Sequence, residues 1–232
     1  MRMPLFFKAF DRNKVHSASD DSVRLPVRSD LHIARKLWHM VTGMVLIFGL
    51  LSGTSQATAL IIMGTIFLAS ATTEFLRLRN PAFNDICVKF MSPFMRANEV
   101  QNVSGMPYYA ASAFLAIAIF PRPVAILSLL YLVFGDPIAS LVGILSKKKA
   151  IQIIPGKSVQ GTAAAFAVCA LVTWFYLNSM NLHGVSLIRL TLLGGFAGAL
   201  AELLPLEIDD NFTIPMVSGF ILWLGFIAIH LA

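Results

Sequence analysis

Six carboxylates stand within or beside long apolar stretches of the chain, and they are the side chains best suited to chemistry. They are Glu74, Asp136, Glu202, Glu207, Asp209 and Asp210. Ionisable groups inside membrane spans are costly, and they usually face a polar cavity that holds a partner. Asp136 is the strongest signal, because small residues around it let helices approach and Pro137 can open the backbone beside it. Several carboxylates ending at one depth predict a polar pocket at one membrane face.

Basic residues at the same predicted level complement these carboxylates. Arg35, Lys36 and His39 open the first apolar stretch. Glu74 and Arg77 stand three residues apart and therefore share one face of a helix. Carboxylates alone would repel a polyphosphate, whereas carboxylates together with cations suit a metal–polyphosphate complex. We therefore treat these five positions as candidate ligands of such a complex.

A glycine-lysine-serine run precedes a predicted helix that starts near residue 161. At such a helix start, backbone N–H groups, the helix dipole and the ammonium of Lys157 converge, and this combination suits a phosphate. The Walker pattern would need glycine at position 151, which is Ile151, so the run is not a P-loop. Gly156, Lys157 and Ser158 are the candidate phosphate ligands.

Hard oxygen donors gather after the sixth apolar stretch, in the run from Glu207 to Asn211. Magnesium favours a few carboxylates together with phosphate oxygens. Asp136, Asp209 and Asp210 are therefore the candidate metal ligands, and Mg²⁺ is the metal that their chemistry favours.

Each of these groups also has a purely structural interpretation. Glu74 and Arg77 suit a structural ion pair, and His39 suits an interfacial histidine bonded to a helix end. The residues from 209 to 211 suit a turn and helix cap before Pro215. The lysine run at 147–149 and the pair Arg35 and Lys36 suit signals of membrane orientation.

Composition places the chain in a membrane. Hydrophobic residues make up 57% of it and charged residues only 13%, about half the share in soluble proteins. Apolar stretches near the ~20 residues of a membrane helix predict an all-α polytopic bundle of about seven spans. The predicted spans are 37–53, 56–76, 106–120, 123–145, 161–178, 187–205 and 213–231, of which 106–120 is the shortest. Residues 81–98 mix apolar and basic side chains, which predicts an interfacial helix.

The basic residues predict the orientation of these spans. With seven spans, all of the 18 Lys and Arg residues except Arg122 and Arg189 fall on one side. The positive-inside rule then places the N-terminus and the polar pocket in the cytoplasm, as in a bacterial inner-membrane protein. Residues 1–36 form a basic cytoplasmic segment and residues 37–232 the transmembrane catalytic domain. The net charge of +6 follows from this topology and indicates no nucleic-acid partner.

The order of these motifs resembles the CTP-dependent lipid kinase family, which includes dolichol, phytol and CTP-dependent diacylglycerol kinases. The resemblance runs from about residue 33 to the C-terminus. It rests on R-K-x-x-H at 35–39, E-x-x-R at 74–77, G-D-x-x-A-S-x-x-G at 135–143, G-K-S-x-x-G-T at 156–162 and E-x-L-P-x-x-x-D-D-N-x-x-x-P at 202–215. The last three blocks together are the more specific part.

The resemblance implies transfer of the γ-phosphate of CTP to the hydroxyl of a membrane lipid alcohol, with Mg²⁺. Asp136 would be the metal or catalytic carboxylate, and Lys157 a phosphate ligand. Glu202, Asp209, Asp210 and Asn211 would belong to the nucleotide–metal site. Asp136 is the first candidate for the base that takes the alcohol proton, and Glu202 is the second.

Two other functions stay open on the sequence. The family is also similar to the CDP-diacylglycerol synthases around the Gly-Asp and lysine blocks, so a phosphatidate cytidylyltransferase is an alternative. A transporter is a weaker one, because the charged groups stop at the cytoplasmic half of the spans. The acceptor, among diacylglycerol, polyprenol, phytol and other isoprenoid alcohols, and a homo-oligomeric state are both open.

Overall fold

The computed structural model describes residues 33–146, 151–206 and 208–229. The predicted basic segment up to residue 32, the lysine run at 147–149 and Glu207 lie outside the described residues. Arg35 and Lys36, which the sequence places at the end of the basic segment, instead lie in the first turn of a helix that begins at Ile33.

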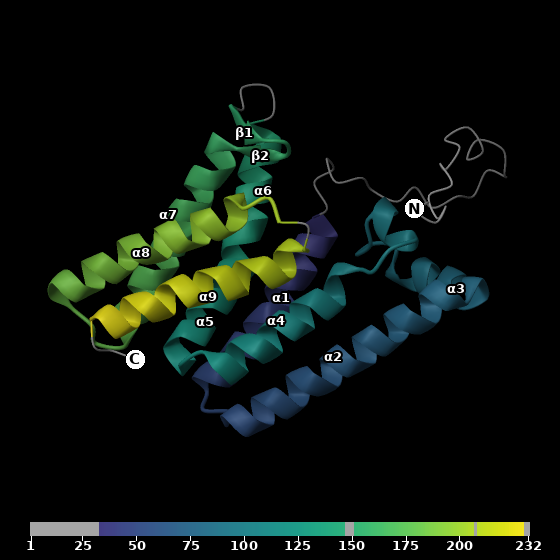
Figure 1. Cartoon of the computed structure of the whole chain (residues 1–232), viewed down its shortest axis with the longest axis horizontal. Coiled ribbons are helices and arrows are strands. Elements are labelled where there is room, and N and C mark those ends of the chain that lie inside the picture. The colour runs from purple at the N-terminus through teal and green to yellow at the C-terminus, as the bar shows by residue number, and fades with distance from the viewer. Residues whose placement is uncertain (1–32, 147–150, 207, 230–232) are drawn as a thin grey trace, which may run out of the picture.

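The described residues form helices joined by short loops, with one 3₁₀ turn, one π turn and one small hairpin (Figure 1). The elements are α1 (Ile33–Leu51), α2 (Gln56–Arg79), α3 (Pro81–Met91), η1 (Ala97–Val100), α4 (Gly105–Ile119), α5 (Arg122–Leu130), η2 (Tyr131–Gly135), α6 (Asp136–Leu145), β1 (Gln152–Ile154), β2 (Lys157–Ser158), α7 (Val159–Ser179), α8 (Gly184–Leu203) and α9 (Asp210–Ala228).

Six helices of the described chain are long and apolar enough to cross a membrane, and one of them is the composite of α5, η2 and α6. An all-α polytopic bundle is therefore confirmed, but the predicted third span is short. At 15 residues α4 reaches about 22 Å, less than the ~30 Å hydrocarbon core. Ser104 caps its start and Pro121 and Pro123 follow its end, so the local sequence stops the helix on both sides.

The predicted interfacial helix over 81–98 is also shorter than expected. Asn80 caps α3, Pro81 is its first residue, and the helix ends at Met91. The chain then turns back, and η1 brings Arg96 and Glu99 beneath α1. This return places charged groups in the bundle that a continuous interfacial helix would have left at its surface.

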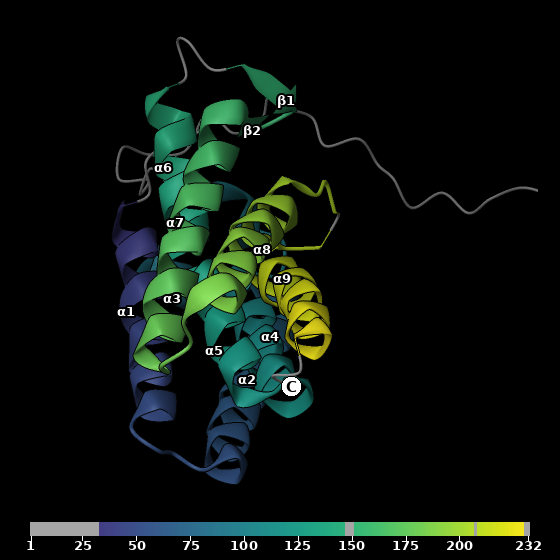
Figure 2. The same cartoon turned by 90° about the vertical axis from the view of Figure 1, so that its left-hand side faces the viewer.

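The composite helix from Arg122 to Leu145 is the centre of the bundle. Its most apolar stretch is 72% buried, against 22–44% for the other spans. It contacts α1, α4, α7 and α9, and α6 packs along α7 below the hairpin (Figure 2). Arg122 holds its far end by donating a hydrogen bond to the carbonyl of Leu50 in α1. The π turn that follows Leu130 is therefore held in position by the helices packed around it.

A π turn interrupts this central helix directly before Asp136. The amide of Asp136 donates to the carbonyl of Tyr131, five residues earlier, and Pro137 has no N–H to continue the regular pattern. π turns inside α-helices are frequent at functional sites. The opened backbone that the Gly-Asp-Pro run predicts is therefore present at the carboxylate.

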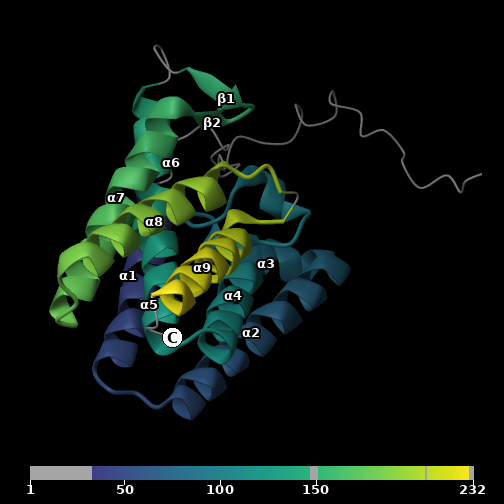
Figure 3. The same ribbon diagram turned by 60° about the vertical axis from the view of Figure 1, so that its left-hand side comes forward.

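The hairpin and the interfacial elements lie at different sides of the bundle. Figures 1 and 3 show β1 and β2 beside the end of α6 and the start of α7, whereas α2 and α3 lie across the molecule. The starts of α4 and α9 and the end of α8 lie between them, so several element ends meet there.

Candidate active site

Lys157 stands at the centre of a carboxylate cluster. Its Nζ lies 3.0 Å from Glu202 Oε1 and 3.3 Å from Asp210 Oδ2. Thr162, in the first turn of α7, donates to the other oxygen of Glu202 at 3.4 Å. Asp136 lies within electrostatic range of Lys157, Asp210 and Glu202. The structure thus brings together side chains from α6, β2, α8 and α9, and these four residues are all predicted site residues.

The hairpin turn delivers this lysine. Gly156 has a φ of +85°, a left-handed conformation that favours glycine, and the turn reverses the chain just before Lys157. Burial alone would lower the pKa of Lys157, but the negative charges of Asp210, Glu202 and Asp136 outweigh that effect and raise it above its ordinary value. Lys157 is therefore a charged ammonium at neutral pH.

The rest of the Gly-Lys-Ser run starts α7. The hydroxyl of Ser158 accepts a hydrogen bond from the amide of Gly161 at 3.1 Å and caps the helix. A Cβ at Gly161 would come within 2.9 Å of the carbonyl oxygen of Ala139, so the glycine lets α7 pack closely on α6. Phosphate binding by Gly156 and Ser158 stays a prediction.

The predicted metal and nucleotide residues of α9 also hold the helix in place. Asp209 accepts a hydrogen bond from the amide of Asn211 and caps α9. The buried side-chain amide of Asn211 donates a hydrogen bond to the backbone carbonyl of Gly105. The backbone carbonyl of Asn211 accepts a hydrogen bond from the hydroxyl of Ser112 in α4. The cap that the sequence offered as an alternative is thus present, and a nucleotide contact of Asn211 stays a prediction.

A second charged group lies under the start of α1. Arg35 Nη1 lies 2.7 Å from Glu99 Oε2, and both side chains are buried. Burial alone would raise the pKa of Glu99, but the hydrogen bond and charge of Arg35, with the amide and charge of Arg96, hold it below its usual range. The side chain of Arg35 also lies against Gly105, beside Asn211 and Asp209. Gly105 therefore joins this group to the start of α9.

Two cationic side chains in this region each have one nitrogen atom for which the described residues offer no hydrogen-bond acceptor. Lys36 Nζ and Arg96 Nε are buried, and neither finds a hydrogen-bond acceptor among the described residues. Both side chains lie within electrostatic range of Asp136. Buried polar groups are normally hydrogen-bonded, and an exception in a functional site points to a missing partner.

Glu74 and Arg77 form a separate network rather than joining Lys157. Two nitrogens of Arg77 contact the two carboxylate oxygens of Glu74, at 2.9 and 2.6 Å. Ser104 donates to the same carboxylate through its amide and hydroxyl. Arg77 also donates to Asn84 and to the carbonyls of Glu99, Val100 and Asn102. These bonds tie the loop before α4 to α2, as a structural ion pair would.

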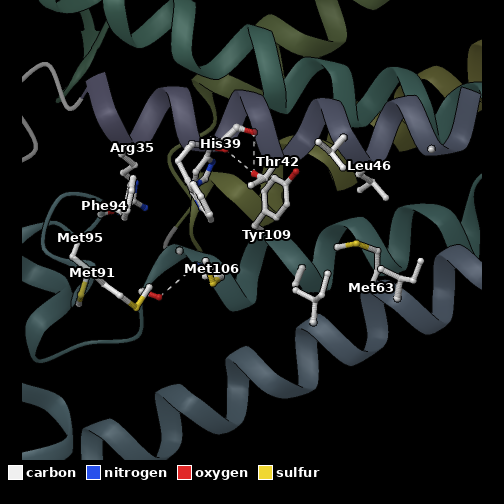
Figure 4. A pocket seen from close by; sticks show the side chains of 18 of the residues that line it. Arg35, His39, Thr42, Leu46, Met63, Met91, Phe94, Met95, Met106 and Tyr109 are labelled. Carbon is white, nitrogen blue, oxygen red and sulfur yellow. Dashed lines mark hydrogen bonds between the residues drawn. The ribbon is translucent and has the colours of Figure 1, made fainter. Parts of the chain in front are cut away.

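His39 points into an apolar cavity of about 590 Å³ between α1, α2 and α4. Its ring meets that of Tyr109 edge to face, with centroids 5.4 Å apart (Figure 4). Arg35 and Glu99 border the same end of the cavity. His39 thus lies beside the charged site rather than inside the Lys157 cluster.

The residues fit magnesium carried by a nucleotide better than magnesium held by protein alone. No three His, Cys, Asp or Glu side chains group as a metal site in the part of the chain that the structure describes. Asp136 and Asp210 nevertheless lie close enough to interact, and Mg²⁺ commonly uses one or two carboxylates plus phosphate oxygens. Asp136 and Asp210 would hold it, and the metal role of Asp209 stays a prediction.

Sequence reasoning missed Arg96 and Glu99. The sequence places both at or beside an interfacial helix, whereas in the structure Glu99 pairs with Arg35, 64 positions earlier in the chain. Their signal is weak but present, because they are charged residues three apart in a segment rich in Met and Phe. In the sequence Thr162 stands out only as part of a motif, and its contact with Glu202 in the structure gives it a position in the site.

Fold and site together define a polytopic membrane enzyme with a lysine–carboxylate centre suited to a phosphorylated substrate. The chain is 30% identical to the CTP-dependent diacylglycerol kinase 1 of Schizosaccharomyces pombe over 201 residues, which span 83% of this chain and 92% of the relative. It is 27% identical to the Saccharomyces cerevisiae protein of the same name, over 88% and 81% of the two chains. This chain belongs to the CTP-dependent lipid kinase family.

A relative with a different named activity widens the family. The probable chloroplastic phytol kinase 2 of Oryza sativa is 30% identical over 201 residues, covering 79% of this chain and 63% of the relative. No family model and no solved structure matches the chain. The similarity to these kinases over most of the chain confirms the family resemblance that the motifs indicate.

Proposed function

We propose that this chain binds CTP at the Asp136–Lys157 site and transfers its γ-phosphate to the hydroxyl of a membrane lipid alcohol. The observation that carries the site is a pair of buried nitrogen atoms, Lys36 Nζ and Arg96 Nε, which belong to partly buried cationic side chains near Asp136 and find no acceptor among the described residues. Buried cationic nitrogens that lack an acceptor, next to carboxylates, suit an anion that brings its own metal. A triphosphate is such a ligand.

The reaction is a direct transfer to oxygen. The lipid hydroxyl oxygen forms a bond to the γ-phosphorus, the bond from that phosphorus to the bridging oxygen breaks, and CDP leaves. Such transfers depend mainly on positioning and on neutralising the charge of the phosphate oxygens. Lys157, Lys36 and Arg96 supply positive charge, and bound Mg²⁺ would supply more.

Asp136 is the better candidate for the base that takes the alcohol proton. Both oxygens of Glu202 are already engaged, one by Lys157 and one by Thr162. Asp136 lies at the opened backbone of the π turn and is only partly buried. Its carboxylate can therefore meet both a substrate hydroxyl and the phosphate.

The relatives' names favour the kinase over the two alternatives. Two of them are named CTP-dependent diacylglycerol kinases and one a probable phytol kinase. A cytidylyltransferase would release pyrophosphate instead of CDP, and a transporter would leave the nucleotide intact. The names support two acceptors of different shape, diacylglycerol and phytol.

The test of this function uses purified protein with Mg²⁺ and CTP labelled at the γ-phosphate, offered diacylglycerol, phytol or a polyprenol. We expect label in the lipid phase with at least one acceptor. Pyrophosphate release with phosphatidate, and no labelled lipid, would identify a cytidylyltransferase and overturn the proposal.

We also propose that the site faces the cytoplasm. The support is the charge pattern, since Lys157, Arg35 and Arg96 all lie at the end that the positive-inside rule assigns to the cytoplasm. A cysteine placed at the exposed Gln152 of the hairpin tests this, in a protein whose partly exposed Cys87 is replaced by serine. An impermeant thiol reagent should label it only after the cells are opened, and labelling of intact cells would reverse the orientation.

Removal of the Arg96 charge tests the phosphate site. We expect Arg96→Gln to raise the KM for CTP about ten- to hundredfold, because a hydrogen bond to a charged group contributes about 1.5–3 kcal/mol. The KM for the lipid should change much less. The matched control is Arg189→Gln, which removes an exposed arginine from α8 and should leave both constants unchanged. An unaltered KM for CTP in the Arg96 variant would remove this residue from the site.

A further inference from the structure

The cavity beside His39 is a candidate for the second substrate. It lies between α1, α2 and α4, and it reaches from Arg35 to Leu50 along α1. The 15 residue steps between these two positions rise about 22 Å, which is most of the hydrocarbon thickness of a bilayer. Figure 4 shows Arg35 and Phe94 at one end and Leu46 and Met63 at the other. The cavity is therefore long and runs along the membrane helices.

The charged side chains of this cavity are confined to one end, and the hydroxyl groups of Thr42, Tyr109 and Thr54 are its other polar groups away from that end. Arg35, His39, Glu99 and Ser104 line that end, and apolar side chains line most of the remainder. A molecule with one polar head and a hydrocarbon tail has the same division. The volume of about 590 Å³ lies in the range of sites for small ligands.

Several residues that line the cavity also form the outer surface of the protein. Val45 of α1 is 69% exposed, and Ile62 of α2 is 48% exposed. Both belong to helices that are long and apolar enough to cross the membrane. The cavity therefore opens toward the lipid between α1 and α2, so a hydrocarbon chain can enter sideways without crossing water.

The lining suits a chain of variable shape. Four of the ten methionines of the protein line the cavity: Met63, Met91, Met95 and Met106. Methionine is flexible and polarizable, and it is common at surfaces that accept varied apolar ligands. This lining favours a linear hydrocarbon over a rigid ring system.

The polar end of the cavity adjoins the proposed nucleotide site. Arg35 lines the cavity and also lies against Gly105, where a Cβ would meet its Nη2 at 2.7 Å and Asn211 Nδ2 at 2.4 Å. Asp209, the cap of α9, borders the same point. Only the absence of a side chain at Gly105 lets these groups converge. A head group at this end would therefore lie next to the residues that start α9.

We infer that this cavity binds one hydrocarbon chain of the lipid acceptor and directs its hydroxyl toward the charged site. The inference rests on the proposed kinase function, because it names the acceptor's binding site. It adds that the hydrocarbon chain lies between α1 and α2, and that the end of the cavity near Leu50 limits the length of hydrocarbon chain that can bind.

The first test fills the far end of the cavity. Ile62 stands 12 residues before Glu74 on α2, about 18 Å from the level of Ser104 at the polar end. We expect Ile62→Trp to raise the KM for a long-chain acceptor about tenfold or more, because each methylene kept out of an apolar site weakens binding about fourfold. An acceptor too short to reach Ile62 should be phosphorylated as before.

The matched control is Ile61→Trp on the same helix. Ile61 is 69% exposed and does not line the cavity, so this variant should leave the KM for either acceptor unchanged. Equal losses in both variants, or equal losses with long and short acceptors, would overturn the inference.

The second test does not depend on turnover. A lipid alcohol with a photoreactive group at the end of its chain is irradiated with the full-length protein without nucleotide. We expect adducts on the cavity residues of α1, α2 and α4, reduced by Ile62→Trp and by unlabelled acceptor, but not by Ile61→Trp. Such adducts in a protein that fails to transfer phosphate would support the cavity and refute the kinase. Adducts spread over all lipid-facing helices would indicate contact with bulk lipid only. Crosslinks between two copies of the protein would indicate that the cavity lies at an interface. Either result would overturn the inference.

Discussion

Asp136→Asn should abolish phosphoryl transfer and leave the protein folded. The substitution keeps the shape of the side chain but removes the base and a negative charge that would face the metal. General base catalysis alone contributes about 10²–10⁴-fold, so we expect kcat to fall by about 10³-fold or more. Lys157 keeps Glu202 and Asp210 as partners, so no unpaired charge is left behind. The measurement is labelled phosphate in the lipid phase, with thermal unfolding in detergent.

The control for this variant is Asp85→Asn. Asp85 is exposed on α3, away from the Lys157 cluster, and its substitution should change neither activity nor unfolding temperature. Full activity of the Asp136 variant would refute its role as base and metal ligand. The Glu202→Gln variant would then be the next to measure, since Glu202 is the second candidate.

Arg77→Met should destabilise the protein more than any other single change that we consider. Arg77 is 2% exposed, and its guanidinium contacts Glu74, Asn84 and three backbone carbonyls. Removing one partner of a buried ion pair leaves the other charge uncompensated and costs about 3–5 kcal/mol. We therefore expect the unfolding temperature to drop by about 10 °C.

Two further variants separate this structural role from nucleotide binding. Arg79→Met removes an exposed arginine two residues away, whose guanidinium lies over the ring of Phe75, and should cost under about 1 kcal/mol. Glu74→Gln combined with Arg77→Met should recover part of the lost stability, because the unpaired carboxylate is then neutral. A raised KM for CTP at unchanged unfolding temperature would instead favour the predicted role of Arg77 as a cofactor ligand.

Most of the helical fold can be predicted from the sequence, because a membrane helix is recognised from the local run of apolar residues that forms it. Apolar length fixes each span, and glycine, proline and capping residues fix the ends, as at Ser104 and Pro121. The short α4 shows the limit of this reasoning. An apolar run of nearly the right length does not reveal whether the helix crosses the bilayer or fills space within the bundle.

The site was only partly predictable, because its parts come from distant segments. Lys157, Glu202 and Asp210 carry motif signals and do meet. Glu99 reaches Arg35 only because the chain turns back after Met91, and no local pattern predicts that return. The sequence alone likewise suggests that Arg96 is only a signal of membrane orientation. In the structure its Nε is buried, and its side chain lies within electrostatic range of Asp136. Long-range packing, rather than propensity, decides these contacts.

The π turn before Asp136 also gives the central helix two phases. A wide turn of this kind holds one residue more than a regular turn, so the side chains after it lie about 100° away from where a regular α-helix over the same residues would place them. The buried half, from Val124 to Leu130, thus packs in one direction, while Asp136 points in another. If the same residues formed a regular α-helix, the carboxylate would turn about 100° away from its present direction, whereas deleting a single residue between Tyr131 and Gly135 would close the π turn and leave that direction unchanged. The direction of the carboxylate is therefore set by the number of residues in one turn of the helix, as well as by the identity of the residue at position 136.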